Sequence, residues 1–140
     1  MQAGVIVIDT GPVIANANRK DADHQRCADL LQNYPGPLLL AQPLLTEIGY
    51  MLASRAGAHA EADFLRDVAE SVYELVAVST ADVTRAAYLV ERYADLPLGT
   101  ADAFVVAIAE RFGAVAIATL DHRHFSIIRP THVPAFTLLP

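Results

Sequence analysis

Apolar residues occur along this chain in short unbroken runs rather than in strict alternation with polar ones. The runs at 5–8 ("VIVI"), 38–41 ("LLLA") and 114–121 ("AVAIATLD") are bounded by Gly, Pro or Asp, which is typical of buried strands. "YELVAV" at 73–78 predicts another strand, and "AFTLL" at 135–139 a short final one. Continuously apolar strands are characteristic of a parallel sheet that is covered on both faces.

Segments with helical spacing and helix-capping residues separate these strands. The expected helices are one with Pro12 at its first position, one capped by Asp21 or Asp23, one from Pro43 to about Arg55 that Gly57 ends, one at 59–71, one that begins at Ser79 or Thr80, and a last one at 100–112 that Gly113 ends. Strands that alternate with helices imply right-handed crossovers. The pattern therefore predicts a single three-layer α/β/α domain over residues 1–140, with a parallel central sheet.

Composition supports one compact domain and limits its location. The 140 residues are 54% hydrophobic and 19% charged, which argues against a disordered chain. No basic N-terminal leader precedes the first strand, and no apolar run approaches the roughly 18 residues of a membrane span. The one cysteine, Cys27, excludes an internal disulfide and a cysteine-rich zinc site. We therefore expect a cytoplasmic protein with no membrane partner.

The charge balance argues against a general nucleic-acid-binding surface. Ten Lys and Arg against sixteen Asp and Glu give 10 − 16 = −6. A polyanionic partner must therefore be bound locally, at a groove or patch. Nine of the ten basic residues are arginine, whose forked side chain suits phosphate and carboxylate groups.

Four acidic residues lie where the predicted topology brings chain segments together. Asp9 and Asp121 end strands, and parallel strands end at the same edge of the sheet. Asp102 stands in the first turn of a helix with no polar side chain from 103 to 109. Glu47 falls on the rim of the apolar arc of the helix that follows Pro43. We expect these carboxylates to converge.

Convergence of four acids would require a cation. Two carboxylates about 5 Å apart repel by roughly 3 kcal/mol at an effective dielectric constant near 20. An all-oxygen cluster suits Mg²⁺ or Mn²⁺ better than Zn²⁺. His122 and His124 would favour a softer metal, but solvated or phosphate-contacting histidines are the favoured interpretation. Hard cations held by carboxylates at a sheet edge are typical of phosphodiester cleavage.

Each acid also has an ordinary structural interpretation. Asp9 can cap the turn at Gly11, Asp102 can complement a helix dipole, Glu47 can be a solvated helix residue and Asp121 can begin a turn. Taken singly, each of these interpretations is favoured over the functional one; it is the four acids together that favour a site.

The ordered set of motifs resembles a known family. "VIVIDTGPVIA", the Glu of "QPLLTEIGYML", "LPLGTADAFVVAIAERFG" and "AIATLDHRHF" are similar in order and spacing to PIN-domain ribonucleases, particularly the VapC toxins of bacterial toxin-antitoxin pairs. The resemblance extends from residue 5 to about 128. It implies a metal-dependent endoribonuclease that is inhibited by a small VapB-like antitoxin.

The resemblance also assigns roles to residues. It implies that Asp9 and Asp102 are the principal metal ligands, that Glu47 and Asp121 complete the catalytic set, and that Thr119 and Asp95 support it. It further implies a homodimer, for which the apolar helix at 103–109, with Phe104 and Phe112, is a candidate contact. The alternative is that this helix is core of the single chain.

Candidate RNA contacts are basic residues near the motif ends. They are Arg123, His122 and Arg19, with Lys20 and Arg129 as further possibilities. Removing the four site acids leaves a charge of −2, and two divalent ions would bring it to +2, so binding is expected to be confined to a groove.

Several other classes of protein are excluded, and two alternatives stay open. A receiver domain needs a late-strand lysine, whereas Lys20 is the only lysine. A dehalogenase-type phosphatase needs a second Asp where Gly11 stands, and no glycine-rich dinucleotide motif follows the first strand. The open alternatives are a PIN-like nuclease outside any toxin system and a non-catalytic module that binds a cation or a basic peptide.

Overall fold

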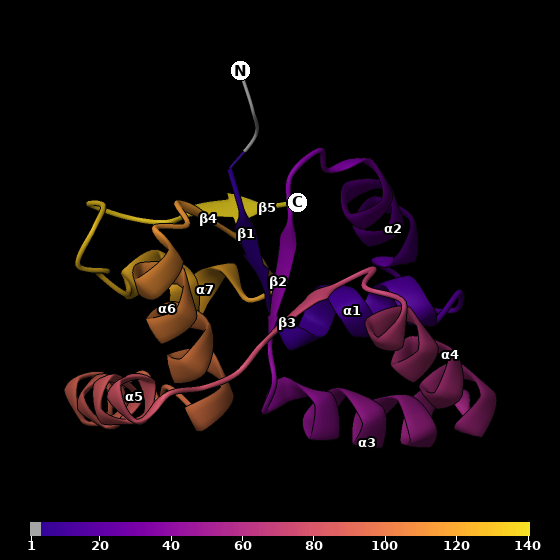
Figure 1. The fold of residues 1–140 in the computed structure, drawn as a ribbon, viewed down its shortest axis with the longest axis horizontal. Coiled ribbons are helices and arrows are strands. Elements are labelled where there is room, and N and C mark those ends of the chain that lie inside the picture. The colour runs from indigo at the N-terminus through magenta and orange to yellow at the C-terminus, as the bar shows by residue number, and fades with distance from the viewer. Residues whose placement is uncertain (1–3) are drawn as a thin grey trace.

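The computed structural model describes residues 4–140 and contains a five-stranded parallel sheet (Figure 1). The strands are β1 (Ile6–Ile8), β2 (Leu38–Ala41), β3 (Glu74–Val76), β4 (Ala116–Ala118) and β5 (Thr137–Leu139). Their order across the sheet is β3-β2-β1-β4-β5, and every neighbouring pair is parallel. The parallel sheet predicted from the apolar runs is confirmed, including the short final strand.

Helices cover both faces of this sheet. They are α1 (Thr10–Ala17), α2 (His24–Asn33), α3 (Leu44–Ala56), α4 (Ala58–Ala69), α5 (Thr80–Arg92), α6 (Thr100–Phe112) and α7 (His122–Ile127). In Figure 1, α1 to α4 lie on one side of the sheet and α5 to α7 on the other. The three-layer α/β/α arrangement is therefore as expected.

The central strand β1 determines where the core and the sheet edge lie. Its three residues are completely buried, and it pairs with β2 on one side and β4 on the other. These neighbours follow β1 in the chain by about 30 and about 110 residues, so the sheet joins distant segments. Burial of such aliphatic side chains contributes about 1.5–3 kcal/mol each.

Local capping determines several helix ends as the sequence predicts. Ser79 and Asp82 form a reciprocal capping box at the start of α5. Gly57 ends α3 at φ 90°, and Gly113 ends α6 in the left-handed region at φ 66°. Both glycines adopt backbone conformations that a side chain would disfavour.

Two expectations about helices were wrong. The helix at 100–112 is not the last one, because α7 follows β4. The first helix begins at Thr10 rather than at Pro12, because Asp9 caps it.

The apolar segment 103–109 of α6 is core of the single chain, which is one of the two interpretations that the sequence left open. α6 packs on β1 and β2 of its own chain, and all its residues from Val105 to Ala109 are buried. Phe112, at the end of α6, is 42% exposed. The homodimer stays a prediction.

A membrane span is not among the described elements. Over residues 4–140, no helix combines the length and the apolar character that crossing a bilayer demands.

Candidate active site

A cavity of about 450 Å³ opens where β1 ends, and all four acids singled out in the sequence line it. Asp9, Glu47, Asp102 and Asp121 reach it from the end of β1, from α3, from α6 and from the residue before α7. The carboxyl edge of a parallel sheet is the usual position of a site in open α/β folds. The convergence predicted from topology is therefore observed.

Asp9 is the most enclosed of the four carboxylates. It is the N-cap of α1, and only 7% of its surface is exposed. Its Oδ1 accepts a hydrogen bond from the Thr10 backbone N–H (2.8 Å), and its Oδ2 accepts one from the Thr119 hydroxyl (2.8 Å). Burial raises the pKa of Asp9 to about 6, against the lowering effect of these hydrogen bonds, and the charges of Asp102 and Asp121 raise it further.

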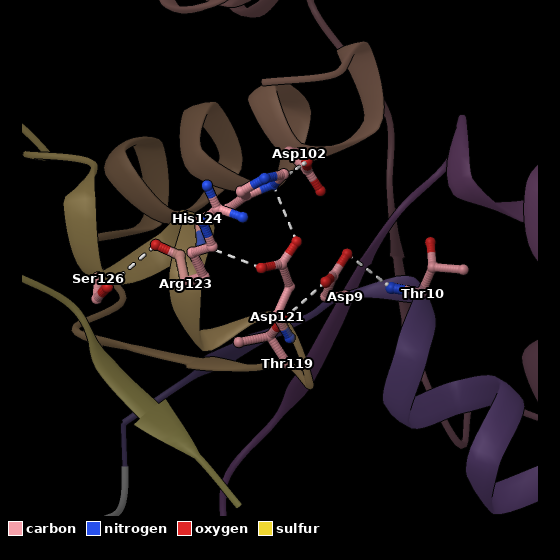
Figure 2. A network of polar contacts seen from close by, with 8 residues as sticks. All are labelled: Asp9, Thr10, Asp102, Thr119, Asp121, Arg123, His124 and Ser126. Carbon is pink, nitrogen blue, oxygen red and sulfur yellow. Dashed lines mark hydrogen bonds and ion pairs between the residues drawn. The ribbon is translucent and has the colours of Figure 1, made fainter. Parts of the chain in front are cut away.

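Thr119 links two of the acids through one buried hydroxyl. While it donates to Asp9, the same oxygen accepts a hydrogen bond from the Asp121 backbone N–H (2.9 Å). Asp121 in turn caps α7, since its Oδ1 accepts from the His124 backbone N–H (3.0 Å). The turn between β4 and α7 is thereby held against the end of β1, as Figure 2 shows.

Asp102 and His124 lie close together beside the cavity. Asp102 lies in the first turn of α6, where the helix dipole favours a negative charge. Burial raises its pKa, and the nearby Asp121 charge adds to that effect. The His124 Nδ1 lies 2.9 Å from Oδ2 of Asp121 and 3.6 Å from Oδ2 of Asp102 (Figure 2). His124 is therefore part of the acidic cluster, whereas the sequence favoured a solvated or phosphate-contacting histidine.

Glu47 occupies the open side of the cavity. Its side chain is exposed, and its Oε2 accepts a hydrogen bond from the Thr10 hydroxyl (3.1 Å). Because Thr10 follows Asp9 directly, this contact fixes α3 relative to the end of β1. Glu47 thus faces the cavity as the helical phase of its segment predicted.

The donor set fits a divalent cation. Asp102, Asp121 and His124 each offer one ligand atom, and these atoms all lie within 4.8 Å of one another. The His124 Nδ1 is buried, and its contact with Asp121 lacks the geometry of a hydrogen bond, so this nitrogen is left without a hydrogen-bond partner. A partly buried carboxylate with a raised pKa, that of Asp102, and an unpaired ring nitrogen are groups that a bound cation would stabilise.

Other predicted residues are less close to this cavity. Asp95 is exposed between α5 and α6, and His122 and Arg123 are exposed on α7; these three are not among the residues that line the cavity. The His122 Nε2 lies 3.2 Å from the Thr119 carbonyl oxygen. Arg19 lines a different cavity, between α1 and α4.

Three residues at the site were absent from the predicted set. Asp21 and Arg55 line the cavity, and His124 completes its acidic cluster. Arg55 lies eight residues after Glu47 on α3, a spacing that keeps both on one helix face, so the sequence did hold a signal for it. Asp21 lies in the loop before α2, where no periodicity indicates a direction.

The parallel α/β/α sandwich and the acidic cavity at the end of its central strand agree with the family to which the sequence is matched. Residues 6–129 match the PIN domain family, and the chain belongs to that family.

Particular proteins similar to this chain include a ribonuclease and two solved structures. The chain is 33% identical over 135 residues to Ribonuclease VapC26 of Mycobacterium tuberculosis, which covers 96% of this chain and 100% of that protein. Its fold is similar to that of M. tuberculosis VapC20, described as a sarcin-ricin loop cleaving toxin (TM-score 0.75, 21% identity, 80% of this chain and 86% of the other). It also resembles VapBC2 from Rickettsia felis bound to a promoter DNA fragment (TM-score 0.65, 15% identity, 96% of both chains).

Proposed function

We propose that this chain is a metal-dependent endoribonuclease toxin of a toxin-antitoxin pair, which hydrolyses RNA phosphodiester bonds. The observation that carries this proposal is the cavity at the end of β1, into which four separate segments bring carboxylates. Family membership and the likeness to Ribonuclease VapC26 support RNA as the substrate.

The residues present define what each would do in the reaction. Asp9, Asp102 and Asp121 would hold Mg²⁺ or Mn²⁺, with the His124 Nδ1 at the edge of the same cluster. When bound, the ion supplies positive charge that neutralises the attacked phosphate and lowers the pKa of water. Thr119 and the Thr10 backbone N–H fix both oxygens of Asp9, so the carboxylate stays oriented through the reaction.

Glu47 would move the proton. Its Oε2 accepts a hydrogen bond from the Thr10 hydroxyl, and the residue lines the cavity, which supports a role in taking a proton from the attacking water. The water oxygen forms the new bond to phosphorus, the bond to the leaving ribose oxygen breaks, and that oxygen takes a proton from solvent.

The proposal is tested by cleavage of end-labelled small RNA. Wild-type protein is assayed in Mg²⁺, in Mn²⁺ and in chelator, beside an Asp9→Asn/Asp102→Asn variant purified in parallel as a control for contaminating ribonuclease. We expect discrete cleavage that requires the metal and is lost in the variant. Equal behaviour of the two proteins would refute the proposal, and a cation- or peptide-binding role would then take its place.

A VapB-like antitoxin is the proposed partner. The acidic cavity suits a basic segment of another protein, because an arginine inserted among these carboxylates would be paired on several sides. Co-expression with the product of a small neighbouring reading frame should yield a complex that no longer cleaves RNA. Purification of the toxin without that product would contradict the pairing.

The predicted homodimer has candidate contacts other than the 103–109 segment of α6. Exposed apolar side chains lie on α3 and α5; these are Tyr50, Val83 and Val90. Light scattering across a range of concentrations tests the dimer, and a mass of 15.1 kDa throughout would refute it.

A further inference from the structure

A second cavity on this acidic protein is lined by three arginines. It measures about 320 Å³ and lies where α5 meets the segment that follows α7. Arg85, Arg92 and Arg129 line it together with Tyr88 and Tyr93, and its lining includes no acidic residue. The chain as a whole carries a net charge of −6, so a cavity lined by three arginines contrasts with its overall charge.

One of the three arginines is neutralised by an acid behind the cavity. Arg85 makes two parallel hydrogen bonds to Glu110, from Nε to Oε1 (2.8 Å) and from an Nη to Oε2 (2.9 Å). Glu110 is largely buried and also accepts a hydrogen bond from the Thr131 backbone N–H (2.9 Å). Within residues 4–140, neither Arg92 nor Arg129 lies within 4 Å of a carboxylate oxygen. Two positive charges are therefore uncompensated here.

Neighbouring groups hold the guanidinium groups in place, and that of Arg129 donates a hydrogen bond to the Ser126 carbonyl oxygen (2.7 Å). The Arg85 guanidinium lies over the Tyr88 ring at 5.0 Å, and that of Arg92 lies over the Tyr93 ring at 5.3 Å. The Tyr93 hydroxyl accepts a hydrogen bond from the Arg129 backbone N–H (2.9 Å), which ties the end of α5 to the chain beyond α7. Guanidinium groups suit phosphate oxygens, and exposed tyrosine rings suit the faces of unpaired bases. Tyr88 is 55% exposed.

The short helix α7 connects this cavity to the acidic one. Asp121 and His124, at its start, face the acids, while Arg129 lies two residues beyond its end. A helix of six residues is about 9 Å long. A few nucleotides of single-stranded RNA can span the length of α7.

We propose that the cavity of Arg85, Arg92, Arg129, Tyr88 and Tyr93 is a second RNA-binding subsite, which binds the phosphodiester backbone of the strand that is cut at the acids. The inference rests on the proposed nuclease function. It adds residues on α5 to the substrate-binding surface, and it explains how a protein of net negative charge holds a polyanion away from its carboxylates.

The test compares two double variants with the same change in net charge. Arg92→Gln/Arg129→Gln alters the subsite, whereas Arg26→Gln/Arg66→Gln removes two exposed arginines on α2 and α4 as the matched control. Binding of a fluorescent oligouridine is measured in chelator over a range of salt concentrations. Each phosphate contact on a single strand contributes about 0.7 to the slope of log K against log salt, so the subsite variant should lose about 1.4 from that slope. The control should keep the wild-type slope, and Arg92→Lys/Arg129→Lys should retain most of it.

Two results would overturn the subsite. One is an equal slope for both glutamine variants. The other is stronger binding of an oligoglutamate than of the oligouridine, weakened by the subsite variant alone, which would assign the cavity to an acidic protein segment. Cleavage of RNA in Mg²⁺ is measured separately. If the subsite variant has a lower salt slope than the wild type but the wild type cuts no RNA, the nuclease proposal is refuted and the binding subsite is retained.

Discussion

Replacing Asp9 by asparagine should stabilise the metal-free protein at neutral pH. Burial raises the pKa of Asp9 from 3.8 to about 6, and each unit corresponds to about 1.4 kcal/mol, so the ionised carboxylate costs the native state about 3 kcal/mol. Asparagine removes that charge, but it has only one oxygen to accept the two hydrogen bonds that Thr10 and Thr119 donate to Asp9. Losing one of these hydrogen bonds costs about 1 kcal/mol. The net gain is about 1–2 kcal/mol, which for a chain of this length is about 3–7 °C in melting temperature.

The pH dependence of this gain follows from the same pKa. Because the native pKa lies above the unfolded one, the native state binds more protons between about pH 4 and about pH 6. The free energy of unfolding contributed by Asp9 therefore falls as pH rises through that window and stays low above it. The difference in free energy of unfolding between Asp9→Asn and the wild type should accordingly be largest at about pH 8 and absent near pH 4.

Thermal melting in chelator from about pH 4 to about pH 8 measures this difference. Asp63→Asn, which alters an exposed carboxylate on α4, is the control and should change little at any pH. Adding Mn²⁺ should stabilise the wild type more than Asp9→Asn and so reduce or reverse the difference. A variant that is less stable than the wild type at neutral pH, or whose advantage does not change with pH, would refute the argument.

Three further predictions concern single interactions. His124→Ala should weaken Mn²⁺ binding about tenfold and Mg²⁺ binding less, because Mg²⁺ relies on oxygen ligands, and calorimetric titration would contradict this if both ions were affected equally. Glu110→Gln should cost about 2–4 kcal/mol in urea unfolding, since it leaves the Arg85 charge partly buried without its partner, whereas replacing both residues by methionine should cost less. Ser79→Ala should cost about 1 kcal/mol by removing the capping box of α5, and an unchanged urea midpoint would show that the cap contributes nothing.

The fold and the positions of Asp9 and Asp102 could be predicted because the apolar pattern there is simple. Asp9 ends a fully apolar strand, and Asp102 is the one charged residue in the first turn of an apolar helix. Their roles as principal ligands came from the family resemblance. Helix α7 could not be predicted, because six residues are too few to show a helical period. Its stability comes from the Asp121 cap and from Phe125, which is completely buried by tertiary packing.

Side-chain direction at the site was harder to predict than position. Which of His122 and His124 faces the acids depends on the rotation of α7, and that rotation is fixed by contacts with α6 and β5 rather than by local sequence. In the same way, Tyr93 and Arg129 are 36 residues apart, and nothing in either segment indicates that their atoms meet. Contacts of this kind become visible only in the folded structure.

The topology of the sheet also affects the order in which a ribosome can make an active molecule. β1 is synthesised early, but one of its two edges stays unpaired until β4, at residues 116–118, has been added. The hydroxyl that orients Asp9 comes from Thr119, and the carboxylate of Asp121 follows two residues later. A nascent chain that lacks this last fifth contains Asp9, Glu47 and Asp102 but has no complete site. Thr119 and Asp121 are therefore added after Asp9, Glu47 and Asp102, so a chain that is truncated before β4 should lack the assembled acidic cluster.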